Sequence, residues 1–114
     1  KFRLKKGLTI VCQPGGEEIL RRFVAEPFTV PLDDLPYPAR VLELGTGVHE
    51  NPFRVECRPL VHPVPCTGYR VEIDGKTIAF CTDTGVCDNA TLLARDADLF
   101  ITECSLKPGE ESPG

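Results

Sequence analysis

An Asp-Gly dipeptide between two strand-like runs is the feature that most constrains how this chain can fold. Asp74-Gly75 separates residues 67–73 from residues 76–82, and the dipeptide suits the positive φ angles of a two-residue hairpin turn. Such a turn fixes the register of the two strands, because it makes Ile73 the partner of Lys76. The sequence therefore predicts an antiparallel hairpin. One of its faces is apolar and holds Tyr69, Val71, Ile78 and Phe80; the other holds Arg70, Glu72, Ala79 and Cys81.

The predicted hairpin carries a histidine before its first strand and an aspartate after its second strand. His62 lies in a loop that Pro63 and Pro65 stiffen, and continued pairing sets Cys66 opposite Asp83. An imidazole and a carboxylate therefore reach the same end of the hairpin. These donors suit zinc, manganese or iron, so the residues predict part of a metal site with His62 and Asp83 as ligands.

A second strand, parallel to the last strand of the hairpin, is predicted to follow a helical crossover. Residues 77–82 and 98–102 are the strands, residues 89–96 form the helix, and the crossover should be right-handed. Asp88 is expected to cap this helix, with Leu92 and Leu93 on its inner side. The continuous apolar run 99–101 is expected to be a strand covered on both faces.

Glu103 follows the second strand of this unit as Asp83 follows the first. Ligands of open α/β sheets bind beyond such carboxyl ends, so both acids are expected at a ligand-binding edge.

The first half of the chain predicts further short elements. They are strands at residues 8–11, 28–30, 40–44 and 53–58 and a helix at residues 16–25. The glycine pair before this helix is interpreted as a plain strand-to-helix turn, because no Lys-Ser/Thr follows it and two glutamates would repel phosphate. His49 is expected in an exposed loop. The fold class is therefore α/β, with a mixed sheet that contains a β-hairpin and a βαβ unit.

The composition is that of a single globular domain. The chain has 114 residues, of which 41% are hydrophobic and 26% are charged. A net charge of -4 argues against a general nucleic-acid-binding surface, and we expect no stable binding of nucleic acid. No apolar run reaches the about 18 residues that a membrane span needs, so no membrane association is expected.

Six cysteines raise the question of redox state. Several of them occupy apolar strand patterns as small hydrophobic residues do, and no secretion signal precedes them. We therefore expect reduced thiols in a cytoplasmic protein. No C-x-x-C pair is present in the sequence, which disfavours a zinc–thiolate site.

Each candidate residue also has a plainer interpretation. An aspartate after a strand can form a turn or cap a helix, and a histidine between valine and proline can pack within a loop. Two donors do not complete a catalytic zinc site, which normally has three protein ligands and a water. The residues by themselves therefore predict an α/β domain whose polar edge is suited to a ligand.

Three motifs in this order resemble the metallo-β-lactamase superfamily. They are His-x-x-x-x-x-Gly-Tyr-Arg from His62, Thr-Asp-Thr-Gly around Asp83, and Asp-Leu-x-Ile-x-Glu-Cys-Ser up to Ser105. The similarity is strongest over residues 58–106, and the nearest branch is ribonuclease Z with related cyclic-phosphodiester hydrolases. The resemblance implies that the chain is part of an αββα sandwich.

The resemblance also implies roles for the candidate residues. His62 matches the isolated metal-ligand histidine of the family, and Asp83 matches the carboxylate that bridges two metal ions, here zinc, with manganese or iron as options. Such a metal pair would activate water to attack phosphorus or an acyl carbon. Glu103 matches an acid beside the site, which we assign to catalysis as a support for the ligands rather than as a ligand.

The sequence departs from the family pattern in two respects. Thr102 stands where ribonuclease Z usually carries a histidine that protonates the leaving group, so tRNA 3′ processing is not expected. The family's His-x-His-x-Asp-His motif and its final ligand histidine are absent from the sequence. Residues 1–114 are therefore interpreted as an internal segment of one such domain, which would bind metal poorly and turn over nothing by itself.

The leading functional hypothesis is a dinuclear-metal hydrolase of small-molecule or nucleotide phosphodiesters. Hydrolysis of lactones or thioesters is the alternative within the enzyme class, because the same activated water attacks an acyl carbon. Two further hypotheses are a metal-free binding domain and a thiol-based site at Cys66 and Cys81. A homodimer is left open.

Overall fold

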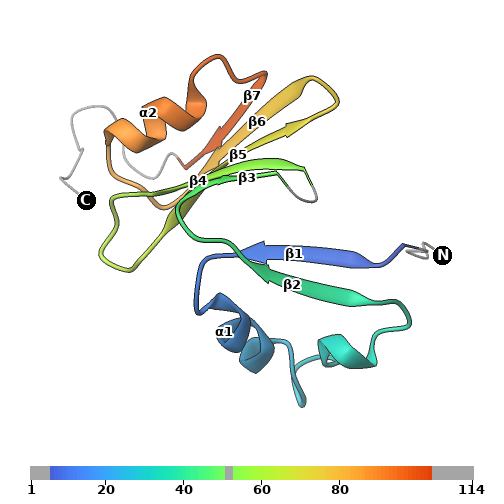
Figure 1. Cartoon of the computed structure of the whole chain (residues 1–114). Coiled ribbons are helices and arrows are strands. Elements are labelled where there is room, and N and C mark those ends of the chain that lie inside the picture. Colours follow the sequence, from blue (N-terminus) through green and yellow to red (C-terminus); the bar gives the residue numbers. More distant parts are fainter. Residues whose placement is uncertain (1–5, 51–52, 104–114) are drawn as a thin grey trace. The chain divides into compact units, whose positions relative to one another are not determined.

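The computed structural model describes residues 6–50 and 53–103 of the chain, which form two compact units (Figure 1). The first unit is Lys1–Gly45 and the second is Thr46–Gly114. Each unit has its own sheet and its own α-helix. The candidate site residues all belong to the second unit.

The first unit is a strand–helix–strand arrangement with a parallel pair of strands. Strand β1 (Leu8–Cys12) pairs in parallel with β2 (Ala39–Glu43), from Leu8 opposite Ala39 to Cys12 opposite Glu43. Helix α1 (Gly16–Phe23) and a 3₁₀ turn, η1 (Leu32–Asp34), lie between the two strands in the chain. The strands expected at residues 8–11 and 40–44 and the helix expected at 16–25 are therefore present, with ends shifted by one or two residues.

The turn into α1 uses a carboxylate of the protein itself at the helix N-terminus. Gly15 has a φ of 83°, which a residue without a side chain adopts readily. The backbone N–H of Glu17 donates to Oε1 of Glu43 at 3.2 Å, so β2 supplies an acceptor to one of the unpaired N–H groups of the first turn. This arrangement agrees with a plain strand-to-helix turn rather than a phosphate-binding loop.

The second unit contains a five-stranded mixed sheet in the order β3-β4-β5-β6-β7. Neighbouring strands are antiparallel except β6 and β7, which are parallel and are joined through helix α2. This is the predicted βαβ unit beside the predicted hairpin. The bounds are β3 (Gly47–His49), β4 (Arg54–Pro59), β5 (Thr67–Ile73), β6 (Lys76–Cys81), α2 (Asp88–Ala94) and β7 (Leu99–Thr102).

The hairpin of β5 and β6 has the predicted register. Ile73 pairs with Lys76 and Tyr69 pairs with Phe80. Asp74 and Gly75 have φ angles of 51° and 74°, which are the positive values that a two-residue turn of this kind requires. The end of the hairpin that carries the candidate site is therefore set by this turn.

Helix α2 covers the sheet face that holds Gly68, Ala79 and Cys81 (Figure 1). Leu93 of the helix is fully buried, as are Ala79 and Cys81. A Cβ at Gly68 would lie 2.6 Å from Leu93 Cδ1, so the absence of a side chain lets the helix approach closely. Of the two leucines expected on the inner side of the helix, Leu93 is inside and Leu92 is 45% exposed.

Three local expectations are wrong. His49 belongs to strand β3, where it pairs with Val55, rather than to an exposed loop. Residues 28–30 form no strand, because no backbone ladder joins them to a neighbour. Residues 99–101 form β7 as expected but are exposed, whereas their continuous apolar run predicted a strand covered on both faces.

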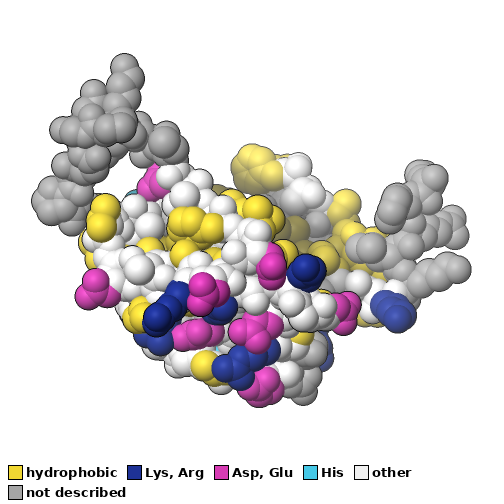
Figure 2. Space-filling view, turned by 90° about the horizontal axis from the view of Figure 1, so that it is seen from above, with side chains coloured by type: hydrophobic (Ala, Val, Ile, Leu, Met, Phe, Trp, Pro, Cys, Tyr) yellow, Lys and Arg dark blue, Asp and Glu magenta, His cyan; other side chains and the backbone are white. Residues whose placement is uncertain are grey.

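On the face of the molecule seen in Figure 2, charges are mixed rather than segregated. Figure 2 shows Lys and Arg side chains next to Asp and Glu side chains, with apolar side chains between them. Ion pairs such as Arg58 with Glu56, at 2.7 Å, account for part of this mixing. None of the helices in residues 6–50 and 53–103 has the length and apolar character that crossing a membrane requires.

Candidate metal centre

The structure ties the loop that carries His62 to the loop that carries Asp83. The backbone N–H of Val61 donates to Oγ1 of Thr84 at 3.2 Å, and the N–H of Gly85 donates to the carbonyl of Val61 at 2.8 Å. The residue before His62 is thus held by the two residues after Asp83. Two segments more than twenty positions apart in sequence are brought together at one end of the hairpin, as the sequence predicted.

His62 is exposed, and one of its ring nitrogens is engaged by its own loop. Nδ1 lies 3.3 Å from the carbonyl oxygen of Val64 and 3.3 Å from the backbone nitrogen of the same residue. In the tautomer in which Nδ1–H donates to that carbonyl, Nε2 keeps its lone pair. A histidine oriented in this way through its other nitrogen is the usual form of a metal ligand.

Asp83 is exposed and has a left-handed backbone conformation. Its φ is 48°, and it lies two residues beyond the end of β6. A non-glycine residue adopts this conformation at an energetic cost, although aspartate tolerates it better than most residues. The turn presents the carboxylate at the edge of the sheet, where the parallel strands β6 and β7 both end.

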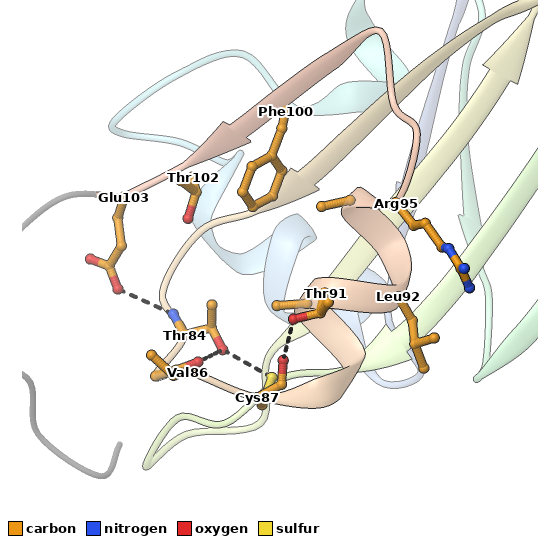
Figure 3. Close-up of a pocket in the computed structure, with 12 residues that line it drawn as sticks. Thr84, Val86, Cys87, Thr91, Leu92, Arg95, Phe100, Thr102 and Glu103 are labelled. Atoms are coloured by element: carbon orange, nitrogen blue, oxygen red, sulfur yellow. Dashed lines mark hydrogen bonds between the residues drawn. The ribbon is translucent and has the colours of Figure 1, made fainter.

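Glu103 supports the turn that follows Asp83. Its Oε1 accepts a hydrogen bond from the backbone N–H of Thr84 at 3.1 Å (Figure 3). The side chain therefore links the end of β7 to the loop after β6. The supporting role of Glu103 in catalysis stays a prediction.

The donor set available in the described residues is incomplete for a metal ion. No group of three or more His, Cys, Asp or Glu side chains in residues 6–50 and 53–103 could hold one. The chemistry of the two best candidates nevertheless fits zinc, because an imidazole nitrogen and an exposed carboxylate are common zinc donors. His62 and Asp83 as ligands therefore stay a prediction, which requires donors from outside this set.

The alternative thiol site receives no support from the geometry. The Cys81 side chain is fully buried, and burial raises the pKa of its thiol. Burial, and then the carboxylate of Asp83, raise the pKa of the Cys66 thiol as well. Both thiols therefore disfavour the thiolate, which is the reactive form.

Thr102 ties the two parallel strands together. Its hydroxyl donates to the carbonyl oxygen of Cys81 at 3.0 Å. The hydroxyl is thus already used as a donor between β6 and β7. That Thr102 does not serve as a proton donor to a leaving group stays a prediction.

A cavity of about 690 Å³ adjoins the candidate centre and was not anticipated from the sequence. It lies between the loop after β6, helix α2 and strand β7 (Figure 3). Thr84 and Glu103 line it, and so does Cys87, whose thiol lies 3.7 Å from Oγ1 of Thr84. Cys87 precedes α2 at the position that the sequence assigned to Asp88, so the sequence pattern gave no reason to single out its thiol.

The mixed sheet, the βαβ unit and the polar sheet edge define an α/β domain of the metallo-β-lactamase type. The chain belongs to the family described as "Beta-lactamase superfamily domain", whose sequence profile matches residues 2–113. Among solved structures, the metallo-beta-lactamase fold protein YhfI from Bacillus subtilis is similar, with a TM-score of 0.61 and 16% identity. That similarity covers 92% of this chain and 40% of YhfI, and it shows the fold.

Two ribonucleases are among the curated proteins that the chain resembles. Ribonuclease BN of Proteus mirabilis (strain HI4320) is 37% identical over 60 residues, which cover 50% of this chain and 20% of the relative. Ribonuclease BN of Escherichia coli O17:K52:H18 is 23% identical over 143 aligned positions, which cover 80% of this chain and 47% of the relative. The chain therefore spans about half the length of these relatives, or less.

Proposed function

We propose that the protein to which this chain belongs is a metal-dependent hydrolase of phosphodiesters, and that His62 and Asp83 are two of its metal ligands. The observation that carries the proposal is the pair of hydrogen bonds between Val61 and the Thr84-Gly85 segment, at 3.2 and 2.8 Å. These bonds hold the loop that carries His62 against the turn that carries Asp83. Membership of the beta-lactamase superfamily supports the same proposal.

Each of the three candidate site residues has a distinct role in this proposal. A bound pair of metal ions, zinc or else manganese or iron, would supply Lewis-acid activation of water. His62 would bind through Nε2 while Nδ1 stays on the Val64 carbonyl. Asp83 would contribute its carboxylate, and Glu103 would keep the turn after Asp83 in place through the N–H of Thr84.

Phosphodiesters are the preferred class of substrate because of the names of the two curated relatives. Both curated relatives described above are named ribonucleases, and a ribonuclease cleaves phosphodiester bonds. The net charge of -4 argues against a large basic surface for a long nucleic acid. A small-molecule or nucleotide phosphodiester is therefore the proposed substrate, with hydrolysis of lactones or thioesters as the competing activity.

The metal proposal is tested by matched substitutions of the only two histidines of the chain. We expect His62→Gln and Asp83→Asn to weaken zinc binding by more than the about 10- to 100-fold that loss of an outer-shell partner causes. His49→Gln is the control, because His49 pairs within β3 and β4 and should not affect the metal. Zinc content after dialysis is the measurement, and equal loss in both histidine variants would contradict the assignment.

The substrate proposal is tested with chromogenic esters on the metal-loaded protein. We expect turnover of bis(p-nitrophenyl) phosphate to exceed turnover of a lactone or a thioester and to disappear in Asp83→Asn. The reverse ranking would favour the acyl substrates. The 114-residue chain alone should bind zinc weakly and show no turnover, since its described residues supply fewer than three clustered donors.

A further inference from the structure

Helix α2 is too short to hold its own position in the protein. It has seven residues, and isolated helices of fewer than about 12 residues are marginal in water. Its N-cap residue is Cys87 rather than one of the Ser, Thr, Asp or Asn residues that cap a helix well. Of its seven residues, Leu93 is the one that is buried. Polar contacts with the neighbouring strands must therefore help to fix where the helix lies.

A side chain in the first turn of α2 bonds to the end of strand β4. Nδ2 of Asn89 donates to the carbonyl oxygen of Pro59 at 2.8 Å, which joins residues 30 positions apart in sequence. Nη1 of Arg58 donates to Oδ1 of the same amide at 3.4 Å. The second contact favours the orientation in which Nδ2 faces the carbonyl. The first turn of α2 is therefore attached to the last residue of β4.

The two residues that this bond joins flank the candidate metal ligands. Pro59 lies three residues before His62, and Asn89 lies six residues after Asp83. Between them, the hydrogen bonds from the loop of His62 to the turn after Asp83 close the other side of the arrangement. The bond of Asn89 therefore limits how far the two ligand-bearing segments can separate.

The C-terminal end of α2 is fixed independently, by strand β5. Nη1 of Arg70 donates to the carbonyl oxygen of Leu93 at 2.8 Å and also to the carbonyl oxygen of Arg95. Carbonyl groups at a helix end have no partner within the helix, so this side chain supplies one. The Arg70 side chain is only 16% exposed, and water therefore competes little for these bonds. A change at Asn89 should release the first turn of α2 and leave its last turn in place.

We propose that Asn89 is a positioning residue of the candidate metal centre. It holds the first turn of α2 on β4, and the position of that turn sets the distance between the loop of His62 and the turn of Asp83. Its side chain acts through the backbone, because its hydrogen bonds are those with Pro59 and Arg58. The inference rests on the proposed function, since it assigns a role toward the two ligands of that proposal.

Amide hydrogen exchange of the 114-residue chain tests the role of Asn89 without any metal. Asn89→Ala removes the donor to β4, so the amides of Val61 and Gly85 should exchange about fivefold faster, as loss of one hydrogen bond predicts. The amide of Asp98 bonds at the other end of β6 and β7 and should keep its rate. Equal acceleration of all three amides would show a general loss of stability and would overturn the proposal. Unchanged rates at Val61 and Gly85 would overturn it too.

Two further variants separate the contact with β4 from the stability of the helix. Asn89→Asp keeps the size of the side chain and adds the negative charge that a helix N-terminus favours, but it loses the N–H donor. A role confined to helix stability predicts slower exchange at Val61 and Gly85 in this variant, whereas the positioning role predicts faster exchange. Thr91→Ala is the matched control, because the Thr91 hydroxyl bonds within the helix, to the Cys87 carbonyl at 3.5 Å, and its loss should leave both rates unchanged.

Zinc binding by the protein to which the chain belongs gives the second readout. Asn89→Ala should weaken zinc binding about fivefold, the factor expected for the lost hydrogen bond, and Thr91→Ala should not change it. Full zinc affinity in Asn89→Ala would overturn the positioning role. The two proposals can fail separately. A His62→Gln variant that keeps its zinc overturns the proposed function, whereas unchanged exchange in Asn89→Ala overturns only the role of Asn89.

Discussion

Asp83 is a candidate metal ligand, and its backbone has a left-handed conformation that costs free energy. The non-glycine residues of the described chain that have a positive φ are Asp74, Asp83 and Asp96, all aspartates. Asp74 is explained by the hairpin turn, whereas the turn at Asp83 has no comparable sequence signature. An energetically costly conformation at a residue that is also a predicted ligand is what a position selected for function would show.

A pair of substitutions at Asp83 separates the backbone from the carboxylate. Both Asp83→Gly and Asp83→Ala remove the proposed ligand, but only glycine adopts a φ of 48° without steric cost. We therefore expect the glycine variant to be more stable than the alanine variant by about 1 kcal/mol. Urea denaturation measures the difference, and zinc binding should be lost equally in both variants. An alanine variant as stable as the glycine variant would show that the turn relaxes.

The contact between Glu103 and Thr84 predicts a local change in hydrogen exchange. Glu103→Ala removes the acceptor of the Thr84 N–H, so exchange of that amide should become about fivefold faster, the equivalent of about 1 kcal/mol. Glu103→Gln keeps an acceptor oxygen of similar reach and should change the rate much less. If the two variants exchange alike, the hydrogen bond does not hold the turn in solution.

The residues of the candidate site could be predicted only in part from the sequence. His62 and Asp83 follow from the hairpin register, because continued pairing places their loops at the same end. The hydrogen bonds of Val61 to the Thr84-Gly85 segment depend on loop conformations, which leave no periodic pattern in a sequence. The surroundings of Cys87 escaped prediction for the same reason, since its hydrogen-bond donors come from several separate segments.

At the scale of elements, turn chemistry predicted more than hydrophobic pattern did. The Asp-Gly turn gave the register of β5 and β6 residue by residue, because a two-residue loop permits one alignment. Strand β3 was missed, since its three residues are too few for an alternating pattern. The apolar run of β7 was misjudged as doubly covered, although its residues are exposed, because a short apolar run does not tell how many faces are packed.

The close approach of α2 to the sheet predicts a strong effect at one glycine. Gly68→Ala should destabilise the protein by about 1–3 kcal/mol, because the new methyl group would meet Leu93, Leu60 and the Cys81 sulfur at 2.6–3.1 Å. Gly45→Ala is the matched control, since its new methyl group would meet a neighbour only at 4.0 Å. Chemical denaturation of both variants measures the difference. Equal stability would mean that α2 can shift without cost.

At the scale of the whole molecule, the chain matches the family over most of its length, but its described residues supply few candidate metal ligands. The family profile matches residues 2–113, whereas the chain covers 40% of the similar solved structure. The βαβ unit and the hairpin need only local contacts and contacts between neighbouring strands, so they form within this length. A metal site draws its donors from several strand ends, and the described residues supply two predicted ligands and one supporting acid. The chain therefore shows the family clearly, whereas the donor set of residues 6–50 and 53–103 is incomplete for a metal ion.

The thiols of the second unit predict how stability depends on pH. Burial raises the pKa of Cys57, Cys66 and Cys81 above their ordinary value of 9.0, whereas hydrogen bonds lower the pKa of Cys87. Above that value the unfolded chain loses the protons that the three raised thiols still bind when folded. Their contribution to stability is therefore complete below pH 9.0 and is lost as pH rises through their folded pKa values. Cys87 has the opposite sign: its contribution is present above 9.0 and is lost as pH falls through its lowered pKa.

Three thiols lose their stabilising contribution as pH rises, and only Cys87 has the opposite sign. The urea concentration at the unfolding midpoint of the reduced protein should therefore decrease as the pH is raised from about 8 to about 10. Cys81→Ala should lower the midpoint at every pH, since it leaves a cavity, but it should also make the pH dependence shallower. Cys87→Ala should make the dependence steeper, because it removes the one thiol with the opposite sign. A midpoint that rises over this range, or slopes that change in the reverse order, would show that the sulfur environments in solution differ from those of the structure.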